Sequence, residues 1–428
     1  MTSARKISRK TRSRMPQTTG FTSSTTRILM TDPTAQARLA FSQGVQQFEQ
    51  GDHEAASRSF TSALALAPGR PSVMLNLGVT QAYLGQFEAS ERLLKQVLAL
   101  DERQHDAWAA LGWAQMEMGQ WPQALRSLER AVALGADSPL QQMRLGQCLA
   151  HEGRLTQALD AFSRAVALDD SLAEAWSQQG HTLREMNRWP EATEAYRRAL
   201  ALGADPELHG YYIAAMGQAQ PADSPPKAYV ETLFDQYAAD FEHHLVDQLG
   251  YQAHRMLIEQ LPNDCPTHLT QTLDLGCGTG LCGPLIRPRT RHLTGVDLSA
   301  AMINKARALQ VYDTLAQADL LAFLTEASTP FDLVLAADVF IYVGRLEAVW
   351  AQLGRLIPAG GWLAFTVEES ESDQDVVLLP TLRYAHNASY IDALAADHGF
   401  LRRALLRAPL RLNQAEALVG CYFYFQKS

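Results

Sequence analysis

Small and bulky apolar residues alternate along the first half of the chain with a fixed period of 34 residues. Glycine marks this period at Gly44, Gly78, Gly112, Gly146 and Gly180. Sixteen positions after each glycine stands a large residue, at Phe60, Leu94, Leu128, Phe162 and Tyr196. A small residue lets two helix axes cross closely, and a bulky one fills the space beside the crossing. The pattern therefore predicts five pairs of antiparallel helices, an α-solenoid over residues 36–204.

A third series of residues predicts the turns inside these pairs. Seven positions after each glycine of the period stand Gly51, Gly85, Gly119, Gly153 and Asn187. Glycine, and asparagine in its place, tolerates the left-handed backbone with which a helix often ends. Residues 205–226 then predict a helix that caps the last pair, followed by a linker with three prolines and a serine.

The second half of the chain changes to short apolar runs that alternate with helical segments. The runs are Leu269–Leu275, Leu293–Val296, Leu315–Ala318, Phe331–Ala336 and Trp362–Val367. This alternation predicts an α/β domain with a mostly parallel sheet. Two final runs, near Leu401–Leu412 and Ala417–Phe425, have no helix between them and predict a hairpin that completes seven strands. We expect a Rossmann-like domain over residues 227–428, with a helical lid over 227–262 and the core over 263–428.

A glycine-rich segment follows the first predicted strand and carries the candidate chemistry. It runs Asp274-Leu-Gly276-Cys277-Gly278-Thr-Gly280, at a turn from strand to helix where backbone N–H groups can meet a ligand. Asp297 ends the second strand, where a carboxylate can accept hydrogen bonds from two ribose hydroxyls. Ser299 is placed to cap a helix over residues 300–310. This half is therefore predicted to bind a nucleoside-containing cofactor.

Two kinds of cofactor match this pattern. Residues 278–283 also satisfy G-x-G-x-x-G with an acid 19 residues later, as in nicotinamide dinucleotide sites. Three further carboxylates favour a cationic cofactor instead: Asp274 before the loop, Asp319 after the third strand and Asp338 after the fourth. Several carboxylates suit a sulfonium and an ammonium and disfavour a polyanion.

These motifs resemble two known families. The 34-residue period is similar to the tetratricopeptide repeats, and residues 227–428 resemble the class I S-adenosylmethionine-dependent methyltransferases. The resemblance implies that a protein or peptide partner binds a concave face of the repeats. It also implies that the acceptor is methylated by S-adenosylmethionine. The apolar stripe that the resemblance implies on the inner helices consists of Val45, Phe48, Val79, Ala82, Trp113 and Met116.

The methyltransferase resemblance also implies roles for individual residues. Asp274 and the loop of Gly276, Cys277, Gly278 and Gly280 would hold the methionine moiety. Asp297, with Leu298 beside it, would bind the ribose, and Asp319 and Leu320 would flank the adenine. Ala337 and Asp338 would line the path of the methyl group. The segment from Phe234 to Ala238, with Phe241, resembles the lid helix of such enzymes.

A catalytic base is the least defined part of the site. His386 is the candidate, as a general base for a poorly ionised acceptor hydroxyl, and the alternative is a structural histidine. Cys277 and Cys282 have no basic partner in the sequence and are interpreted as small fillers. Neither the cysteines nor the adjacent pair His243-His244 has the spacing of a metal site, so we predict no metal.

Composition narrows the classes of function. The 428 residues carry 37 basic and 46 acidic side chains, and seven of the basic ones lie in residues 1–29, which contain no acid. Residues 1–35 are therefore predicted to be a disordered basic tail, and the alternative for residues 1–29 is a targeting segment. The residues after 29 have a net charge of −16, which disfavours nucleic acid as a substrate. No apolar run reaches the ~20 residues of a membrane helix, so no membrane span is predicted. Five cysteines without pairing motifs indicate a reducing, cytoplasmic location.

The sequence thus predicts an S-adenosylmethionine-dependent methyltransferase whose repeats recruit a protein partner or a protein-bound substrate. The alternative is a scaffold that does not catalyse a reaction and retains the cofactor fold. The residues leave open whether oxygen, nitrogen, sulfur or carbon is methylated, because transfer from a sulfonium depends mainly on proximity and orientation.

Overall fold

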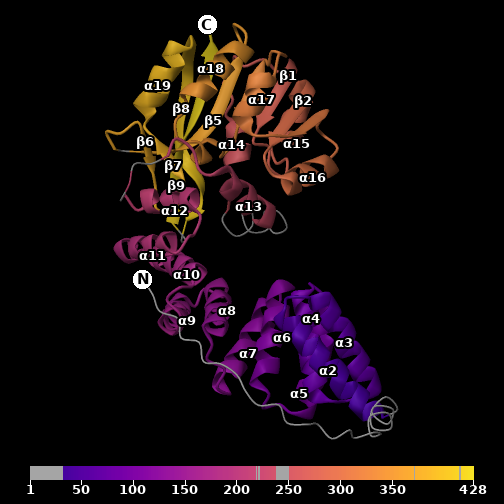
Figure 1. Ribbon diagram of the computed structural model, residues 1–428. Coiled ribbons are helices and arrows are strands. Elements are labelled where there is room, and N and C mark those ends of the chain that lie inside the picture. The colour runs from indigo at the N-terminus through magenta and orange to yellow at the C-terminus, as the bar shows by residue number, and fades with distance from the viewer. Residues whose placement is uncertain (1–31, 218, 220–221, 238–249, 371, 414–415) are drawn as a thin grey trace, which may run out of the picture. The chain divides into compact units, whose positions relative to one another are not determined.

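A computed structural model describes residues 32–217, 219, 222–237, 250–370, 372–413 and 416–428 (Figure 1). The chain divides into two compact units, residues 1–170 and residues 171–428, here called the N-terminal and C-terminal units. Residues 1–31 of the predicted tail lie outside the described residues. The first described helix begins at Pro33, before the predicted start at residue 36.

Four helix pairs make up the described part of the N-terminal unit. They are α2 (Pro33–Glu49) with α3 (His53–Leu66), α4 (Pro71–Tyr83) with α5 (Phe87–Leu100), α6 (His105–Glu117) with α7 (Trp121–Ala133), and α8 (Pro139–His151) with α9 (Leu155–Leu168). A Cβ atom added at Gly44 would lie 2.7 Å from the ring of Phe60, so only glycine fits this crossing. Gly51 has a φ of +79°, as the predicted turn requires. These contacts confirm the predicted helix pairs.

The fifth helix pair belongs to the C-terminal unit. It consists of α10 (Ala173–Glu185) and α11 (Trp189–Ala201), and α12 (Pro206–Ala215) packs against α11. A Cβ atom at Gly180 would lie 2.6 Å from the ring of Tyr196, and Asn187 has a φ of +58°. The repeat period thus continues through α11, while the C-terminal unit already begins at residue 171.

Hydrogen bonds join α12 and the linker to the α/β half of this unit, residues 227–428. The hydroxyl of Tyr211 donates to the carbonyl of Leu382 over 2.8 Å, and the hydroxyl of Tyr384 donates to the carbonyl of Ala222 over 2.7 Å. The linker also lies against Gly344, where an added Cβ atom would be 2.5 Å from the carbonyl oxygen of Asp223. The last repeat is therefore packed against the α/β half.

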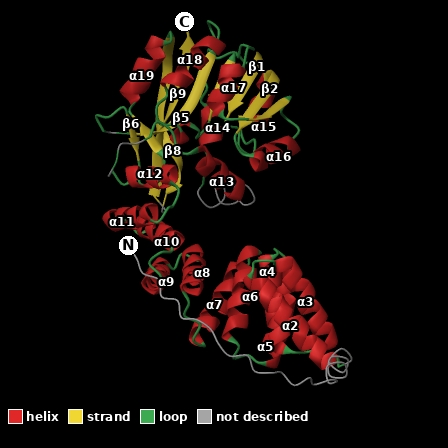
Figure 2. Cartoon of the chain, viewed as in Figure 1, coloured by secondary structure: helices red, strands yellow, loops and turns green. Residues whose placement is uncertain are grey.

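One sheet of nine strands organises the rest of the C-terminal unit (Figure 2). The strands are β1 (Leu269–Leu275), β2 (Thr290–Asp297), β3 (Thr314–Gln317), β4 (Leu333–Ala336), β5 (Trp362–Glu369), β6 (Val376–Leu378), β7 (Tyr384–His386), β8 (Phe400–Asn413) and β9 (Glu416–Lys427). The order β3-β2-β1-β4-β5 is parallel throughout. β9 runs antiparallel to β5 and forms the predicted hairpin with β8.

The predicted mostly parallel sheet is confirmed, with two strands more than the seven expected. The additional strands, β6 and β7, have three residues each, and β7 pairs with the end of β5. Such short strands give no periodic signal in the sequence. The candidate residue His386 ends β7, and α19 (Ala388–Asp397) follows it.

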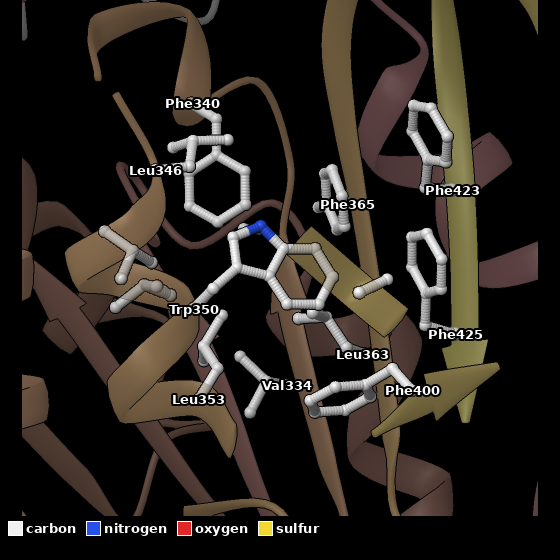
Figure 3. Close-up of a cluster of buried hydrophobic side chains, with 14 of the residues drawn as sticks. Val334, Phe340, Leu346, Trp350, Leu353, Leu363, Phe365, Phe400, Phe423 and Phe425 are labelled. Atoms are coloured by element: carbon white, nitrogen blue, oxygen red, sulfur yellow. The ribbon is translucent and has the colours of Figure 1, made fainter. Parts of the chain in front are cut away.

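Side chains alternate across β5 and contribute to a core on each face of the sheet. Leu363 and Phe365 face a cluster with Trp350 of α18 (Glu347–Leu356), shown in Figure 3. The Trp350 ring lies 5.5 Å from the rings of both Phe400 and Phe425, in edge-to-face geometry. This cluster also takes in residues of α17 (Leu320–Glu326) and α19.

The opposite face of the sheet packs against other helices. Trp362 and Ala364 of β5 belong to a second cluster, with side chains of α14 (Ala253–Glu259) and α15 (Gly283–Ile286). The two short helical turns η2 (Arg287–Arg289) and η3 (Phe340–Tyr342) and helix α16 (Ala300–Ala308) complete the domain. Ser299 caps α16 as predicted, since its hydroxyl accepts from the N–H of Met302.

The predicted lid is described in part. Helix α13 (Lys227–Tyr237) and α14 lie in the range predicted for it, whereas residues 238–249, and with them Ala238 and Phe241, fall outside the described residues. None of the described helices is both long and apolar enough to cross a bilayer. All five cysteines are free thiols and are buried.

The helix crossing at Gly180 generates the first testable prediction. Gly180→Ala should lower the free energy of unfolding by about 1–3 kcal/mol, because the added methyl group meets the Tyr196 ring at 2.6 Å. Gly210→Ala, in α12 of the same unit, should raise it by about 0.5–1 kcal/mol, because nothing lies within 4 Å of the added atom. Urea unfolding of both variants measures the contrast, and equal effects of the two substitutions would contradict the close crossing.

Candidate functional site

A cavity of about 800 Å³ opens at the carboxyl ends of the parallel strands in the C-terminal unit. Residues that follow β1, β2, β3 and β4 line one part of it, and residues of α10, α13, β8 and the β6–β7 loop line another. In parallel sheets the strand ends converge on one edge, so loops distant in sequence meet there. This cavity is the candidate site.

The glycine-rich loop forms the cavity wall after β1. Gly276 has a φ of +68°, and a Cβ atom there would lie 2.5 Å from Cγ2 of Val339. Gly278 has a φ of +53°, and nothing lies within 4 Å of the position its Cβ would take. Both glycines line the cavity. The loop thus brings bare backbone to the cavity surface, where a side chain at Gly276 would not fit.

Asp297 ties this loop to the start of α16. Its Oδ2 accepts the N–H of Gly278 and its Oδ1 accepts the N–H of Ser299, each over 2.9 Å. Burial raises the pKa of Asp297, and these backbone hydrogen bonds act against that rise. An ionised carboxylate has about four acceptor positions, so both oxygens can accept further hydrogen bonds from a ligand in the cavity.

The segments that follow β3 and β4 contain the other predicted site residues. Asp319 caps α17, accepting the N–H of Ala322 over 3.0 Å, and its second oxygen lies 3.5 Å from Nζ of Lys227 in α13. The predicted residues that line the cavity are Gly276, Gly278, Asp297, Leu298, Asp319, Leu320, Ala337 and Asp338. The structure therefore brings these eight together in one site.

Asp274, Cys277 and Gly280 lie behind the loop and do not line the cavity. The Asp274 side chain is 1% exposed and accepts a 2.6 Å hydrogen bond from the hydroxyl of Tyr312. Burial raises its pKa to about 6. Gly280 packs against the C-terminal end of α16, because its Cβ would lie 3.3 Å from Cα of Ala306 and 2.9 Å from Leu309, which follows the helix. Asp274, Cys277 and Gly280 thus support the loop from behind, and the contact of Asp274 with an ammonium group stays a prediction.

A cluster of buried charges lies where Asp338, which follows β4, and Arg411 of β8 line the cavity. Arg411 of β8 pairs with Asp338, and its Nη2 lies 2.7 Å from Oε1 of Glu368. Arg383 also binds this carboxylate, over 2.5 Å. Asp338 has a φ of +60°, and its Oδ1 is buried without a hydrogen-bond partner among the described atoms. The aromatic side chains of Tyr251 and Tyr342 complete the wall.

His386 does not line the cavity. Its side chain is fully buried in β7, and its Nε2 lies 2.8 Å from the carbonyl oxygen of Gly344 and 3.0 Å from that of Val343. Burial lowers its pKa to about 4. A neutral imidazole that donates to backbone carbonyls has a structural role in this geometry, which does not support the proposed general base.

Sequence reasoning missed Glu368, Arg383, Arg411 and Arg184. Glu368 lies at the carboxyl end of β5, so the strand-end argument that selected Asp297 could have found it. Arg411 sits far along the chain on β8, and only the pairing of β8 with β9 and of β9 with β5 brings it to the site. Arg184 lies in the fifth repeat, where the repeat pattern gives no sign of a cavity.

A second candidate surface lies on the inner helices of the N-terminal unit. The ring of Tyr83 lies 5.3 Å from that of Phe48 and 4.9 Å from that of Trp113. The guanidinium of Arg144 lies 4.3 Å above the Trp113 ring. These four residues, here called the aromatic row, come from α2, α4, α6 and α8. Phe48 and Trp113 were predicted for this face, whereas Tyr83 and Arg144 were not.

Sequence-family models match both halves of the chain. The one described as "Methyltransferase domain" matches residues 273–363. Models described as "Tetratricopeptide repeat" match residues 47–98, 109–173 and 175–209.

Individual proteins resemble the chain over shorter stretches. Malonyl-[acyl-carrier protein] O-methyltransferase of Enterobacter lignolyticus is 32% identical over 188 residues, 44% of this chain and 69% of that protein. Trans-aconitate 2-methyltransferase of Paracidovorax citrulli is 30% identical over 129 residues, 30% of this chain and 48% of that protein. The crystal structure of magnesium protoporphyrin IX methyltransferase from Synechocystis matches with a TM-score of 0.38 and 15% identity, over 47% of this chain and 99% of that one.

The burial of Asp274 predicts a pH-dependent difference between wild type and Asp274→Asn. The folded state raises the pKa of this carboxyl from 3.8 to about 6, so the native state binds its proton more tightly than the unfolded state does. The contribution of Asp274 to stability is therefore present below about pH 4 and is lost as the pH rises through 6. The stability of Asp274→Asn relative to wild type should rise by about 2–3 kcal/mol between pH 4 and pH 7.5. Denaturant titrations at both pH values measure this, and a pH-independent difference would contradict it.

Proposed function

Because this chain belongs to the S-adenosylmethionine-dependent methyltransferases and carries tetratricopeptide repeats, we propose that it methylates a carboxylate oxygen of an acceptor carried on a protein partner. The observation that carries the proposal is the cavity, which has the glycine loop and Asp297 on one side and Arg184, Arg383 and Arg411 on the other. The alternatives of a dinucleotide cofactor and of a non-catalytic scaffold are set aside, because the relatives are methyltransferases.

The residues at the strand ends fit S-adenosylmethionine, which supplies an electrophilic methyl group on a sulfonium when bound. The backbone at Gly276 and Gly278 would lie against the methionine moiety, at a surface that a Cβ atom of Gly276 could not share. Asp297, beside Leu298, would accept hydrogen bonds from the ribose hydroxyls. Asp319 and Leu320 would flank the adenine. The unpartnered Oδ1 of Asp338 offers an acceptor for a positively charged or donor group.

The chain's own residues would bind, orient and shield the reactants. A carboxylate is ionised at neutral pH, so an acceptor of this class needs no general base, in agreement with the buried position of His386. Val230, Leu233 and Phe234 of α13 line the cavity and would exclude water from it. Ala337 and Asp338 would line the path of the methyl group, and the adjoining arginines would attract the acceptor's negative charge.

The relatives support the acceptor class. One is named for O-methylation of a malonyl group on an acyl-carrier protein and another for methylation of trans-aconitate, and both of these substrates contain carboxylates. The cavity matches such an acceptor, because Arg184, Arg345, Arg383 and Arg411 all line it.

The repeats support a protein-bound acceptor. The aromatic row presents rings and one guanidinium on successive inner helices, and Tyr83 is 49% exposed. Aromatic and arginine side chains are the commonest energetic anchors of protein interfaces. We propose that this row binds the partner that delivers the acceptor. The five buried, unpaired thiols favour a cytoplasmic site of action.

Methyl transfer to a defined carrier tests the proposal. With radiolabelled S-adenosylmethionine, the full chain should label malonyl-[acyl-carrier protein] and leave acetyl-[acyl-carrier protein] unlabelled, because the acetyl group has no free carboxylate. The product should be a base-labile methyl ester. Labelling of both carriers, or of neither by protein that binds S-adenosylhomocysteine, would contradict the proposed acceptor class.

Two variants control this assay. Asp297→Ala should weaken S-adenosylhomocysteine binding by about ten- to hundred-fold, as expected for loss of hydrogen bonds to a charged group, and should abolish labelling. Asp264→Ala removes an exposed carboxylate that pairs with Arg403 away from the cavity, and should change neither property. Calorimetry measures cofactor binding independently of the acceptor.

A further inference from the structure

The fifth repeat contributes a side chain to the wall of the cavity. Arg184 lies in the last turn of α10 and lines the cavity with Arg383 and Arg411. Its Nη1 donates to the carbonyl of Pro380 over 3.1 Å, which places the guanidinium against the β6–β7 loop. Both helices of this repeat belong to the same compact unit as the sheet, so the contact lies within one folded body.

Arg184 differs in its pairing from the other cations that line the cavity. Arg345 pairs with Glu347 over 3.1 Å, Arg383 pairs with Glu368, and Arg411 pairs with both Glu368 and Asp338. Lys227 lies 3.5 Å from Asp319. Among the described side chains, no carboxylate lies within ion-pair distance of Arg184, and its Nε is buried without a hydrogen-bond partner.

Arg184 is partly buried, and its buried Nε is a donor without an acceptor, which is unfavourable unless a ligand supplies one. The titratable side chains near Arg184 include the phenols of Tyr196 and Tyr229 and the imidazole of His181, whose pKa burial lowers to about 3. Burial raises the pKa of Tyr229, which also lines the cavity, and the positive charges of Arg184 and Arg383 act against that rise. The positive charge left without a carboxylate at this wall is therefore that of Arg184, because Glu368 and Asp338 pair with Arg383 and Arg411.

We propose that Arg184 binds the carboxylate of the acceptor, so that the last tetratricopeptide repeat supplies a specificity-determining residue of the methyltransferase site. This inference rests on the proposed function for the class of acceptor and deepens it by naming a residue that selects it. The repeat domain then has two roles, because its last pair forms part of the acceptor site and its first four pairs carry the aromatic row.

The contacts of α12 with the β6–β7 loop and with β7 hold Arg184 in place. Tyr211 of α12 is 2% exposed, and its hydroxyl donates to the carbonyl of Leu382, next to Arg383. The ring of Tyr211 also lies 6.3 Å from that of Tyr384 in β7. The β6–β7 loop is thus fixed by α12 on one side and by the Arg184 side chain on the other.

Binding of malonyl-coenzyme A and acetyl-coenzyme A to the full chain loaded with S-adenosylhomocysteine tests the proposal without requiring turnover. The two probes share every phosphate and differ in one carboxylate. Wild type should bind malonyl-coenzyme A at least ten-fold more tightly. Arg184→Gln should remove most of this preference and leave the affinity for acetyl-coenzyme A and for S-adenosylhomocysteine within two-fold of wild type. Arg184→Lys, which keeps the charge, should retain part of the preference.

Arg188→Gln is the matched control, because Arg188 lies on the same repeat and pairs with Glu191 at the surface. It should leave the preference unchanged. An unaltered preference in Arg184→Gln would overturn the role of Arg184 while leaving the carrier assay intact as the test of the proposed function. Equal loss of affinity for both probes would also overturn it, since the effect would then not depend on the carboxylate. No preference in wild type would exclude a carboxylate at this position.

Discussion

The buried hydrogen bond from the hydroxyl of Tyr211 to the carbonyl of Leu382 joins the repeats to the catalytic fold. Leu382 has a φ of +63°, so the chain turns sharply there and presents its carbonyl to α12. Breaking this contact would leave a buried carbonyl or hydroxyl without a partner, which costs more than the bond contributes when made. This bond fixes the β6–β7 loop, and Arg184 donates to Pro380 of the same loop.

A second constraint orders the opposite side of the cavity. The parallel register of β1 with β2 and β4 brings the glycine loop, Asp297 and Asp338 to one edge of the sheet. Asp297 then uses both oxygens to fix backbone N–H groups of two different loops. The cofactor side is therefore built from local turns on a rigid sheet, whereas the acceptor side is assembled from α10, α13, β8 and the β6–β7 loop. This division suits an enzyme in which the cofactor is constant and the acceptor is selected by added elements.

The sequence predicted most of the fold and of the cofactor side, for physical reasons. The helix crossing at Gly180 requires glycine there and a large side chain at Tyr196, and this pair is visible in the sequence. The positive φ of Gly276 likewise favours glycine, so this position is also visible in the sequence. The residues on the acceptor side of the cavity have no such pattern in the sequence. Arg411 reaches Glu368 only through strand pairing, and the sequence leaves open whether His386 is a base or structural, because the three-residue β7 that buries it has no periodic pattern. Asp274 fits the sequence motif, yet it lies behind the loop because Tyr312 binds it there.

Native-state hydrogen exchange of the full chain tests the central claim, that the fifth repeat is structurally part of the catalytic unit. The account predicts that amides of α10 and α12 open together with those of β1 and β5, at the same free energy and with the same dependence on denaturant. Exchange of α10 together with the helices α2 to α9, at a free energy different from that of the sheet, would contradict it. In that case Arg184 would belong to the repeat array and would not be a fixed part of the acceptor site.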